Sequence, residues 1–121
     1  MRYFDKNGKH NFVDKNNVLV GYDSSQDCCE HASWYLSTIE RVDREDYNTI
    51  DPKTLEDYIF DPTYFAEESG EQFDSGGLVR FKLVAPDKPD VFLHLFNAHN
   101  GYYSHGFNML KDTEVIRDGC L

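Results

Sequence analysis

Three short runs with apolar and aromatic residues, separated by polar breaks, occur near the start of the chain, and this arrangement is typical of β-strands. The first two runs flank Asn7-Gly8, and the third, residues 18–22, follows a polar break. Asparagine and glycine tolerate the positive φ angles of a two-residue type I′ turn, so the first two runs are expected to pair as a hairpin. Residues 1–23 are therefore predicted to form antiparallel strands.

The C-terminal third contains three further strand-like runs. They cover residues 78–85, 90–98 and 102–110. The turn PDKP joins the first two runs, and Asn100-Gly101 predicts a tight turn that would pair Phe96 with His105 in the last two. This register places the aliphatic residues of 90–98 on one face, and its aromatic residues and His94 on the other. We expect residues 58–65 to cover the aromatic face.

Between these β regions the spacing of apolar residues changes from two to about 3.6, which indicates a helix. The positions that carry this period are Cys29, Ala32, Leu36 and Ile39. Ser24 is a candidate N-cap, and Asp27 three residues later gives an arrangement similar to a capping box. The principal helix of the chain is therefore predicted at about residues 28–42.

The middle of the chain predicts shorter elements. Asp51-Pro52 combines a capping residue with a proline at the first helical position, so a short helix is expected there. Residues 61–77 repeat the Asp-Pro start and then become polar, which indicates a loop with helical turns. We therefore predict a single α+β domain over residues 1–121. Its mainly antiparallel sheet would come from the N- and C-terminal hairpins and pack on the principal helix, with the acidic middle as a partly helical excursion.

The negative charge of the chain is concentrated in one segment. The net charge is −10, and residues 40–74 contribute −9 of it through 12 acidic and three basic residues. This balance argues against binding to nucleic-acid backbones, which requires clustered lysine and arginine. The segment would instead attract a protein with a basic surface, unless its acids only keep the surface hydrated. The candidate contact residues are Glu45, Asp46, Glu67 and Glu68.

The apolar pattern and the cysteine count favour a cytoplasmic protein. No apolar run approaches the roughly 18 residues of a membrane span, and the N-terminal sequence MRYFDKNGKH lacks the apolar core of a signal peptide. Cys28, Cys29 and Cys120 are an odd number of cysteines, which does not fit a secreted disulfide framework. We therefore expect free thiols in a reducing compartment and no membrane contact, with an oligomeric state that the sequence leaves open.

Cys28 is a candidate catalytic nucleophile. In the first turn of the predicted helix it would lie at the positive end of the helix dipole, which stabilises a thiolate and lowers the thiol pKa. A thiol enzyme also needs a base, for which His99 and His105 are the candidates. Against this hypothesis, the carboxylates of Asp27 and Glu30 on either side raise the pKa of a thiol. We therefore favour a non-enzymatic protein.

Cys28 and Cys29, together with His31, His99 and His105, contain enough donors for a zinc site. However, vicinal cysteines on a helix point about 100° apart, and the sequence has no C-x-x-C or H-x-x-x-H pair. A zinc-binding domain is therefore an alternative hypothesis, and no metal ligand or cofactor is assigned.

Residues 97–107, NAHNGYYSHGF, concentrate amides, histidines and aromatic rings at the predicted hairpin tip. Aromatic surfaces with adaptable hydrogen-bonding groups suit the recognition of a ligand or a protein. The alternative is a polar turn whose side chains only satisfy its own backbone. The candidate binding residues are Asn97, His99, Asn100, Tyr102, Tyr103, Ser104 and His105.

Two segments of the chain resemble motifs of a known family. YDSSQDCCEHASW (22–34) and LFNAHNGYYSHGF (95–107) are similar to segments of a family of short uncharacterised proteins from bacteria and their phages. In that family a D-C-C-E helix start and an H-N-G-Y-Y-S-H-G-F hairpin recur together. The resemblance implies a small domain of unknown function, often in mobile-element surroundings, in which both segments belong to one structural unit.

These observations leave three functional hypotheses. The leading one is a small interaction or inhibitory protein, of phage or mobile-element type, that presents residues 40–74 to a basic protein. The alternatives are a thiol-dependent enzyme that uses Cys28 with His105 or His99, and a zinc-binding domain.

Overall fold

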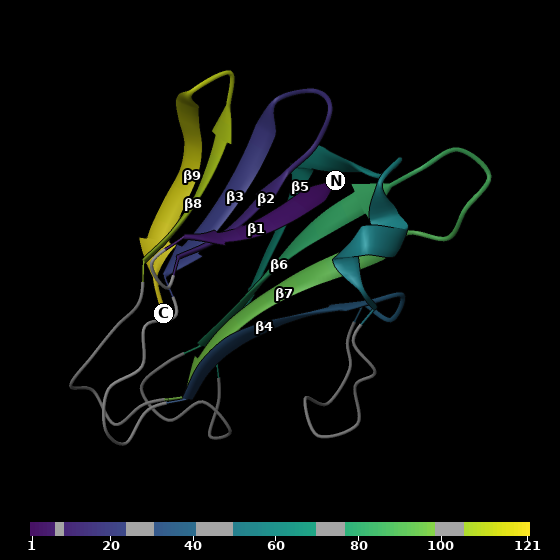
Figure 1. The fold of residues 1–121 in the computed structure, drawn as a ribbon. Helices are drawn as coiled ribbons and strands as arrows, with labels where there is room; N and C mark the ends of the chain where they lie inside the picture. The colour runs from purple at the N-terminus through teal and green to yellow at the C-terminus, as the bar shows by residue number, and fades with distance from the viewer. Residues whose placement is uncertain (7–8, 24–30, 41–49, 70–76, 99–105) are drawn as a thin grey trace.

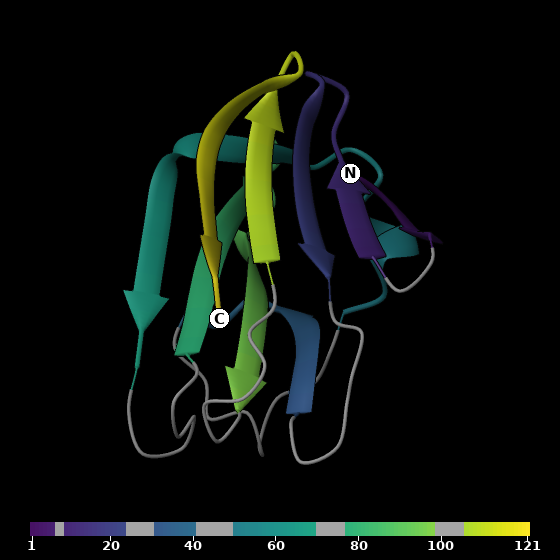
Figure 2. The ribbon, with the colours of Figure 1, turned by 90° about the vertical axis from the view of Figure 1, so that its left-hand side faces the viewer.

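The computed structural model describes residues 1–6, 9–23, 31–40, 50–69, 77–98 and 106–121. In these ranges the chain forms nine β-strands, one short 3-10 helix and no α-helix. The strands build two antiparallel sheets that pack face to face as a β-sandwich (Figure 1). The view turned by 90° shows one sheet in front of the other (Figure 2). The predicted α+β class is therefore wrong.

Five strands form sheet A in the order β1-β2-β3-β8-β9. They are β1 (Arg2–Lys6), β2 (Lys9–Val13), β3 (Val18–Asp23), β8 (Gly106–Lys111) and β9 (Glu114–Cys120). The pairing of Lys6 with Lys9 joins β1 and β2 as the predicted N-terminal hairpin. The third predicted strand, β3, pairs with β2 on one side and β8 on the other. The strands predicted within residues 1–23 are thus confirmed.

Four strands form sheet B in the order β4-β7-β6-β5. They are β4 (His31–Ser37), β5 (Ile59–Glu68), β6 (Gly77–Val84) and β7 (Val91–Ala98). The predicted runs 78–85 and 90–98 pair with each other as β6 and β7. β7 lies between β4 and β6, and its side chains from Val91 to Asn97 are all buried.

Strand β4 replaces the described part of the predicted helix 28–42. Ala32 and Leu36 pack in the core between the two sheets, whereas Tyr35 is fully buried on the opposite face of sheet B. A strand that is apolar on both faces lacks simple alternation, so its pattern resembles that of a helix. Ile39, which the helix would bury, is 54% exposed.

The predicted C-terminal hairpin is also wrong, because β7 belongs to sheet B and β8 to sheet A. Phe96 pairs with Ser33 and Leu78 in sheet B. The connection that contains Asn100-Gly101 therefore links the two sheets. The predicted faces of β7 are confirmed: its aliphatic side chains join the core between the sheets, and Phe96 packs on the opposite face of sheet B.

The acidic middle begins with a helical turn, as expected. The 3-10 helix η1 (Pro52–Leu55) has Asp51 as its N-cap, and the Asp51 carboxylate accepts a hydrogen bond from the Lys53 backbone nitrogen at 3.0 Å. The element extends for only four residues. The predicted start of this helix at Asp51-Pro52 is confirmed, but the element is a single 3-10 turn.

The loop with helical turns predicted for residues 61–77 is wrong in its described part, since β5 continues to Glu68. Pro62 is tolerated there because β5 is an edge strand whose register shifts between Asp61 and Ala66. The aromatic face of β7 is covered partly from this strand, as expected: the Tyr64 ring lies 5.7 Å from that of Phe92.

The hydrophobic core fills the space between the sheets and draws on both. Phe12, Val20 and Met109 come from sheet A, and Phe81, Leu83, Leu93 and Leu95 come from sheet B. Two buried hydrogen bonds also join the layers. The Tyr22 hydroxyl donates to the Phe96 carbonyl at 2.8 Å, and the Phe60 backbone nitrogen donates to the Asp14 carboxylate at 2.8 Å.

Gly119 in β9 leaves room for the Phe107 ring of the core, so we expect its replacement by alanine to destabilise the fold. A Cβ at position 119 would lie 2.9 Å from the Phe107 ring, which packs near Phe65 and Phe81 and has little room to move. We expect Gly119→Ala to lower the free energy of unfolding by about 2 kcal/mol through overpacking, as measured by urea denaturation.

Gly21→Ala is the matched control for this prediction. A Cβ at position 21 would meet the ends of the half-buried Asn108 side chain and the exposed Lys9 side chain, which can rotate away more easily than a packed ring. We expect a loss of about 1 kcal/mol or less. Equal losses for the two variants would contradict the close packing of Phe107.

Candidate functional site

Six strand ends lie at the same end of the sandwich, which we call the shared end (Figure 2). Its strand ends are Asp23, His31, Glu68, Gly77, Ala98 and Gly106. Pairing places His31 opposite Ala98, and Gly77 opposite Asn97. The strand ends that flank residues 24–30, 70–76 and 99–105 therefore lie close together, although they come from both sheets.

Most of the predicted site residues lie outside the described residues. They are Cys28, Glu45, Asp46, His99, Asn100, Tyr102, Tyr103, Ser104 and His105. Residues 24–30 and 99–105 both adjoin the shared end, whereas the described residues next to 41–49 follow the other end of β4. The strand arrangement thus relates the two motif segments to each other, and it does not place Glu45 and Asp46 with Glu67 and Glu68.

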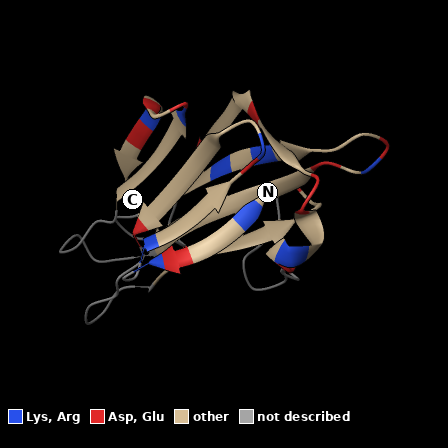
Figure 3. Ribbon diagram, turned by 45° about the horizontal axis from the view of Figure 1, so that its top comes forward, with Lys and Arg blue, Asp and Glu red and all other residues tan. Residues whose placement is uncertain are grey.

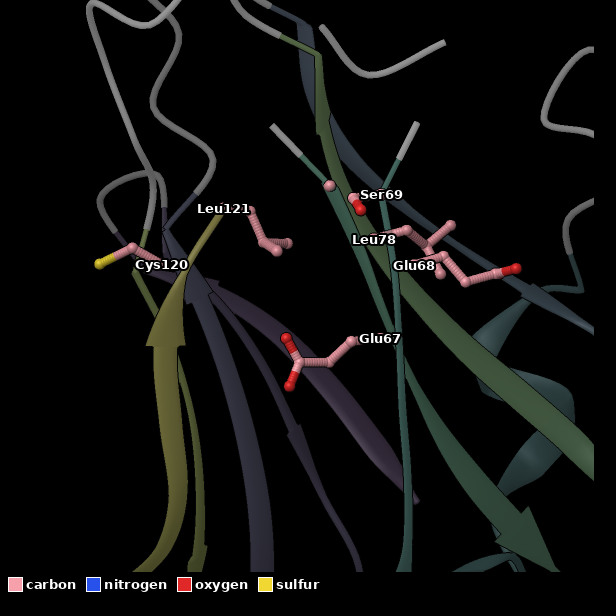
Figure 4. A pocket seen from close by; sticks show the side chains of 7 residues that line it. Glu67, Glu68, Ser69, Leu78, Cys120 and Leu121 are labelled. Carbon is pink, nitrogen blue, oxygen red and sulfur yellow. The ribbon is translucent and has the colours of Figure 1, made fainter. Parts of the chain in front are cut away.

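A pocket of about 210 Å³ opens at the shared end, between the end of β9 and strands β5 and β6 (Figure 4). Its lining residues are Glu67, Glu68, Ser69, Gly77, Leu78, Cys120 and Leu121. The Leu121 side chain extends toward Ser69 and Leu78, and the Cys120 sulfur points away from the pocket (Figure 4). Glu67 is exposed, so a carboxylate stands at a pocket with two leucine walls.

Asn97, the one described residue of the predicted hairpin-tip set, is fully buried. Its side-chain nitrogen donates a hydrogen bond to the Leu121 carbonyl at 2.9 Å. This bond fastens the segment after β9 to the central strand of sheet B. Asn97 therefore holds Leu121, which lines the pocket, in place.

Glu68 already has an internal partner, because its carboxylate forms an ion pair with the Arg80 guanidinium. Arg80 lies in the middle of β6 and is only 2% exposed. A buried guanidinium needs such a counter-charge, since removing one partner leaves an uncompensated charge in the interior. Of the two adjacent acids in β5, Glu68 therefore serves the fold, and Glu67 is directed to solvent.

A buried polar cluster surrounds His94 on the outer face of sheet B. The imidazole is fully buried and stacks on the Tyr35 ring, with centroids 4.3 Å apart and planes at 10°. Its Nε2 lies 3.2 Å from the Glu40 carbonyl oxygen, and the Tyr64 hydroxyl donates to the Glu40 carboxylate at 2.7 Å. Burial is the largest cause that lowers the pKa of His94 to about 4, and Arg80 adds to it.

The sequence interpretation missed Arg80 and Glu40 as members of this cluster, whereas Tyr64 lies in the segment that was expected to cover this face. Arg80 interrupts the apolar run GLVRFKLV of β6, and a single charge inside a buried strand is a signal for a buried ion pair. No local pattern connects Glu40 with β7, since the contact between Glu40 and His94 joins residues that are 54 positions apart along the chain.

The acids of the 40–74 segment do not form one continuous acidic face in the described part of the chain. Lys and Arg lie among Asp and Glu on both sheets (Figure 3). The Asp57 carboxylate accepts a hydrogen bond from Lys88 at 2.5 Å, and that of Asp61 accepts hydrogen bonds from the Thr63 backbone and hydroxyl. Two acids of the segment, Asp57 and Glu68, are therefore paired with cationic side chains from outside it.

The residues of the thiol and zinc hypotheses are only partly described. Cys120 is an exposed free thiol, and its backbone pairs with Gly106, the residue after His105. The described ranges contain no group of three histidine, cysteine or acidic side chains placed to hold a metal ion. Both hypotheses depend on Cys28, His99 and His105, and they stay predictions.

Residues 3–109 match the model of a family described as Domain of unknown function (DUF7448). The chain belongs to this family. The DUF7448 match spans both motif segments and every strand from β2 to β7, so the expected membership in an uncharacterised family is confirmed. Neither the curated proteins nor the solved structures contain a match to the chain.

The described part of this DUF7448 protein has no helix that is long and apolar enough to cross a membrane.

Proposed function

We propose that this chain is a non-catalytic binding protein and that the shared end of the sandwich contacts a basic protein partner. The observation that carries the proposal is the meeting of six strand ends at one end of the sandwich, where the pocket beside Glu67 opens. Binding residues are often found on connections that a rigid scaffold brings together. Two of the connections at this end carry the polar and aromatic motifs at 24–30 and 99–105.

Glu67 gives the proposed surface its preference for a positive charge. Its carboxylate is exposed, and no described residue pairs with it. Glu68, Asp57 and Asp61, by contrast, have internal partners. The apolar side chains of Leu78 and Leu121 could pack on the stem of a lysine or arginine while Glu67 binds its charged end.

The charge preference is tested with Glu67→Gln and a fluorescein-labelled decalysine peptide, read by fluorescence anisotropy. At an ionic strength of about 20 mM the variant is expected to bind at least about threefold more weakly, because a contact between exposed charges is lost. The difference should disappear at about 500 mM, where such contacts are screened.

Glu114→Gln is the matched control, since it removes the same charge from an exposed position at the other end of β9. Equal affinities of the two variants at low salt would contradict the proposed surface. Glu45→Gln with Asp46→Asn tests the remaining predicted contacts. Glu68→Gln is not suitable, because it would leave the buried Arg80 guanidinium without its partner.

An inhibitory role is the narrower form of the same proposal. A partner whose basic surface normally contacts another anionic molecule would be blocked when this chain covers it. Competition between the chain and that molecule, lost in Glu67→Gln and kept in Glu114→Gln, distinguishes inhibition from simple binding.

A further inference from the structure

A separate cavity lies at the open side of the sandwich, between the edge strands β1 and β4. Its volume is about 520 Å³, and η1 forms its third wall. The backbone nitrogen of Met1 donates to the carbonyl oxygens of Leu55 and Tyr58, both at 2.8 Å, so η1 is held against the start of β1. The cavity is thus bounded by three fixed elements and has the size of a small-molecule site.

Two aromatic rings form the floor of this cavity. The rings of Tyr3 and Trp34 have centroids 4.9 Å apart and planes tilted by 42°. Both side chains are half-buried, and the fully buried ring of Phe12 packs edge-on against Trp34 at 5.0 Å. The core therefore supports the rings from behind, and their remaining surface faces the cavity.

A hydrogen bond between the Tyr3 hydroxyl and His10 Nδ1, 2.7 Å long, fixes the Tyr3 ring. Burial lowers the pKa of His10 and raises the pKa of Tyr3. At neutral pH the imidazole is therefore uncharged and accepts the hydrogen bond that the tyrosine donates. This contact holds the floor in place.

The four charged side chains at the rim of the cavity cancel in charge, and the Met1 ammonium behind them is bound by the backbone carbonyls of Leu55, Glu56 and Tyr58. Arg2 and Lys53 supply hydrogen-bond donors, Asp51 and Glu56 supply acceptors, and all four side chains are exposed. A phosphate would favour a net positive rim, and a basic peptide a net negative one. A wholly apolar ligand would exclude water from the four charged groups without replacing their hydrogen bonds.

We propose that this cavity binds a neutral saccharide whose ring stacks on Trp34 and Tyr3. A sugar ring has an apolar face of C–H groups that suits the aromatic floor. Its hydroxyl groups both donate and accept hydrogen bonds, so they match a rim that offers cationic donors and carboxylate acceptors together. The site is distinct from the shared end and does not depend on the function proposed for it.

The emission of Trp34 provides a direct test, because it is the one tryptophan of the chain. The probes are neutral trisaccharides of glucose, galactose, mannose and N-acetylglucosamine, titrated to millimolar concentration. At least one is expected to change the emission saturably. Lys53→Ala should weaken that binding about tenfold through the loss of a charged donor. Lys111→Ala, an equally exposed lysine on β8, should leave it unchanged.

Calorimetry with Trp34→Phe confirms the location independently of fluorescence, and it should show weaker binding of the same trisaccharide. The proposal is overturned if none of the trisaccharides gives a saturable change. It is also overturned if Lys53→Ala and Trp34→Phe bind as tightly as the parent chain, or if glucose 6-phosphate or adenosine binds and the neutral sugars do not.

Discussion

Replacement of Asp14 by alanine is expected to lower the free energy of unfolding by about 4 kcal/mol. Asp14 is 6% exposed, and its carboxylate accepts three backbone hydrogen bonds. The nitrogens of Asn16 and Val18 donate to Oδ1, both at 2.9 Å, and that of Phe60 donates to Oδ2 at 2.8 Å. Alanine leaves these groups unsatisfied, and buried backbone N–H groups without a partner are strongly unfavourable.

Asp14→Asn separates the two parts of this contact. The amide oxygen of asparagine can still accept from Asn16 and Val18, but the amide nitrogen would face the Phe60 N–H, and two donors do not bond. We expect a loss of about 2 kcal/mol for Asp14→Asn, and less than about 0.5 kcal/mol for the exposed control Glu114→Ala. Urea denaturation measures all three variants. An Asp14→Ala loss below about 1 kcal/mol would show that the carboxylate does not link the sheets.

The elements that were predicted well are those determined by neighbours in the chain. Asn7-Gly8 predicts a hairpin, and Lys6 does pair with Lys9. Asp51 caps η1 as its sequence signal indicates. Both features depend on a few consecutive residues, which is the range over which turn and capping preferences act.

The predicted helix failed because its apolar spacing fits two structures. Ala32 and Leu36 are four residues apart, which places them on one face of a helix and also on one face of a strand. Tyr35 would have broken the alternation of a half-buried strand, but here both faces of sheet B are covered. A single sequence does not reveal that the second face of sheet B is covered. Without that knowledge, the apolar spacing of β4 fits a helix better than a half-buried strand.

The C-terminal hairpin failed because pairing partners are chosen by the whole sandwich. β7 pairs with β4 and β6, so no edge of it is left for β8. An Asn-Gly signal reports only that the chain can turn, and it carries no information about competing strands. The same limit hid the polar cluster, since His94 lies in β7, Arg80 in β6 and Glu40 in the segment after β4.

Acidification is expected to reveal the burial of His94. In the unfolded chain this imidazole takes up a proton near its ordinary pKa of 6.5, whereas in the folded chain its pKa is about 4. The unfolded state therefore binds more protons between these values, and stability falls as the pH decreases from about 6.5 to about 4. The difference in pKa corresponds to about 3 kcal/mol, which is present at neutral pH and lost at about pH 4.

His94→Phe separates this contribution from those of the other groups that titrate in the same range. The phenyl ring can still stack on Tyr35, and it has no ionisable group. The parent chain and the variant are unfolded with urea at a series of pH values between 7 and 4. The stability of the parent relative to His94→Phe should fall by about 3 kcal/mol across the series. His94→Gln, which also has no ionisable group, serves as a second reference in case phenylalanine disturbs the packing around Glu40 and Arg80. The stability of the parent relative to His94→Gln should show the same trend with pH. A difference that stays constant with pH would mean that the imidazole reaches solvent and is protonated in the folded chain.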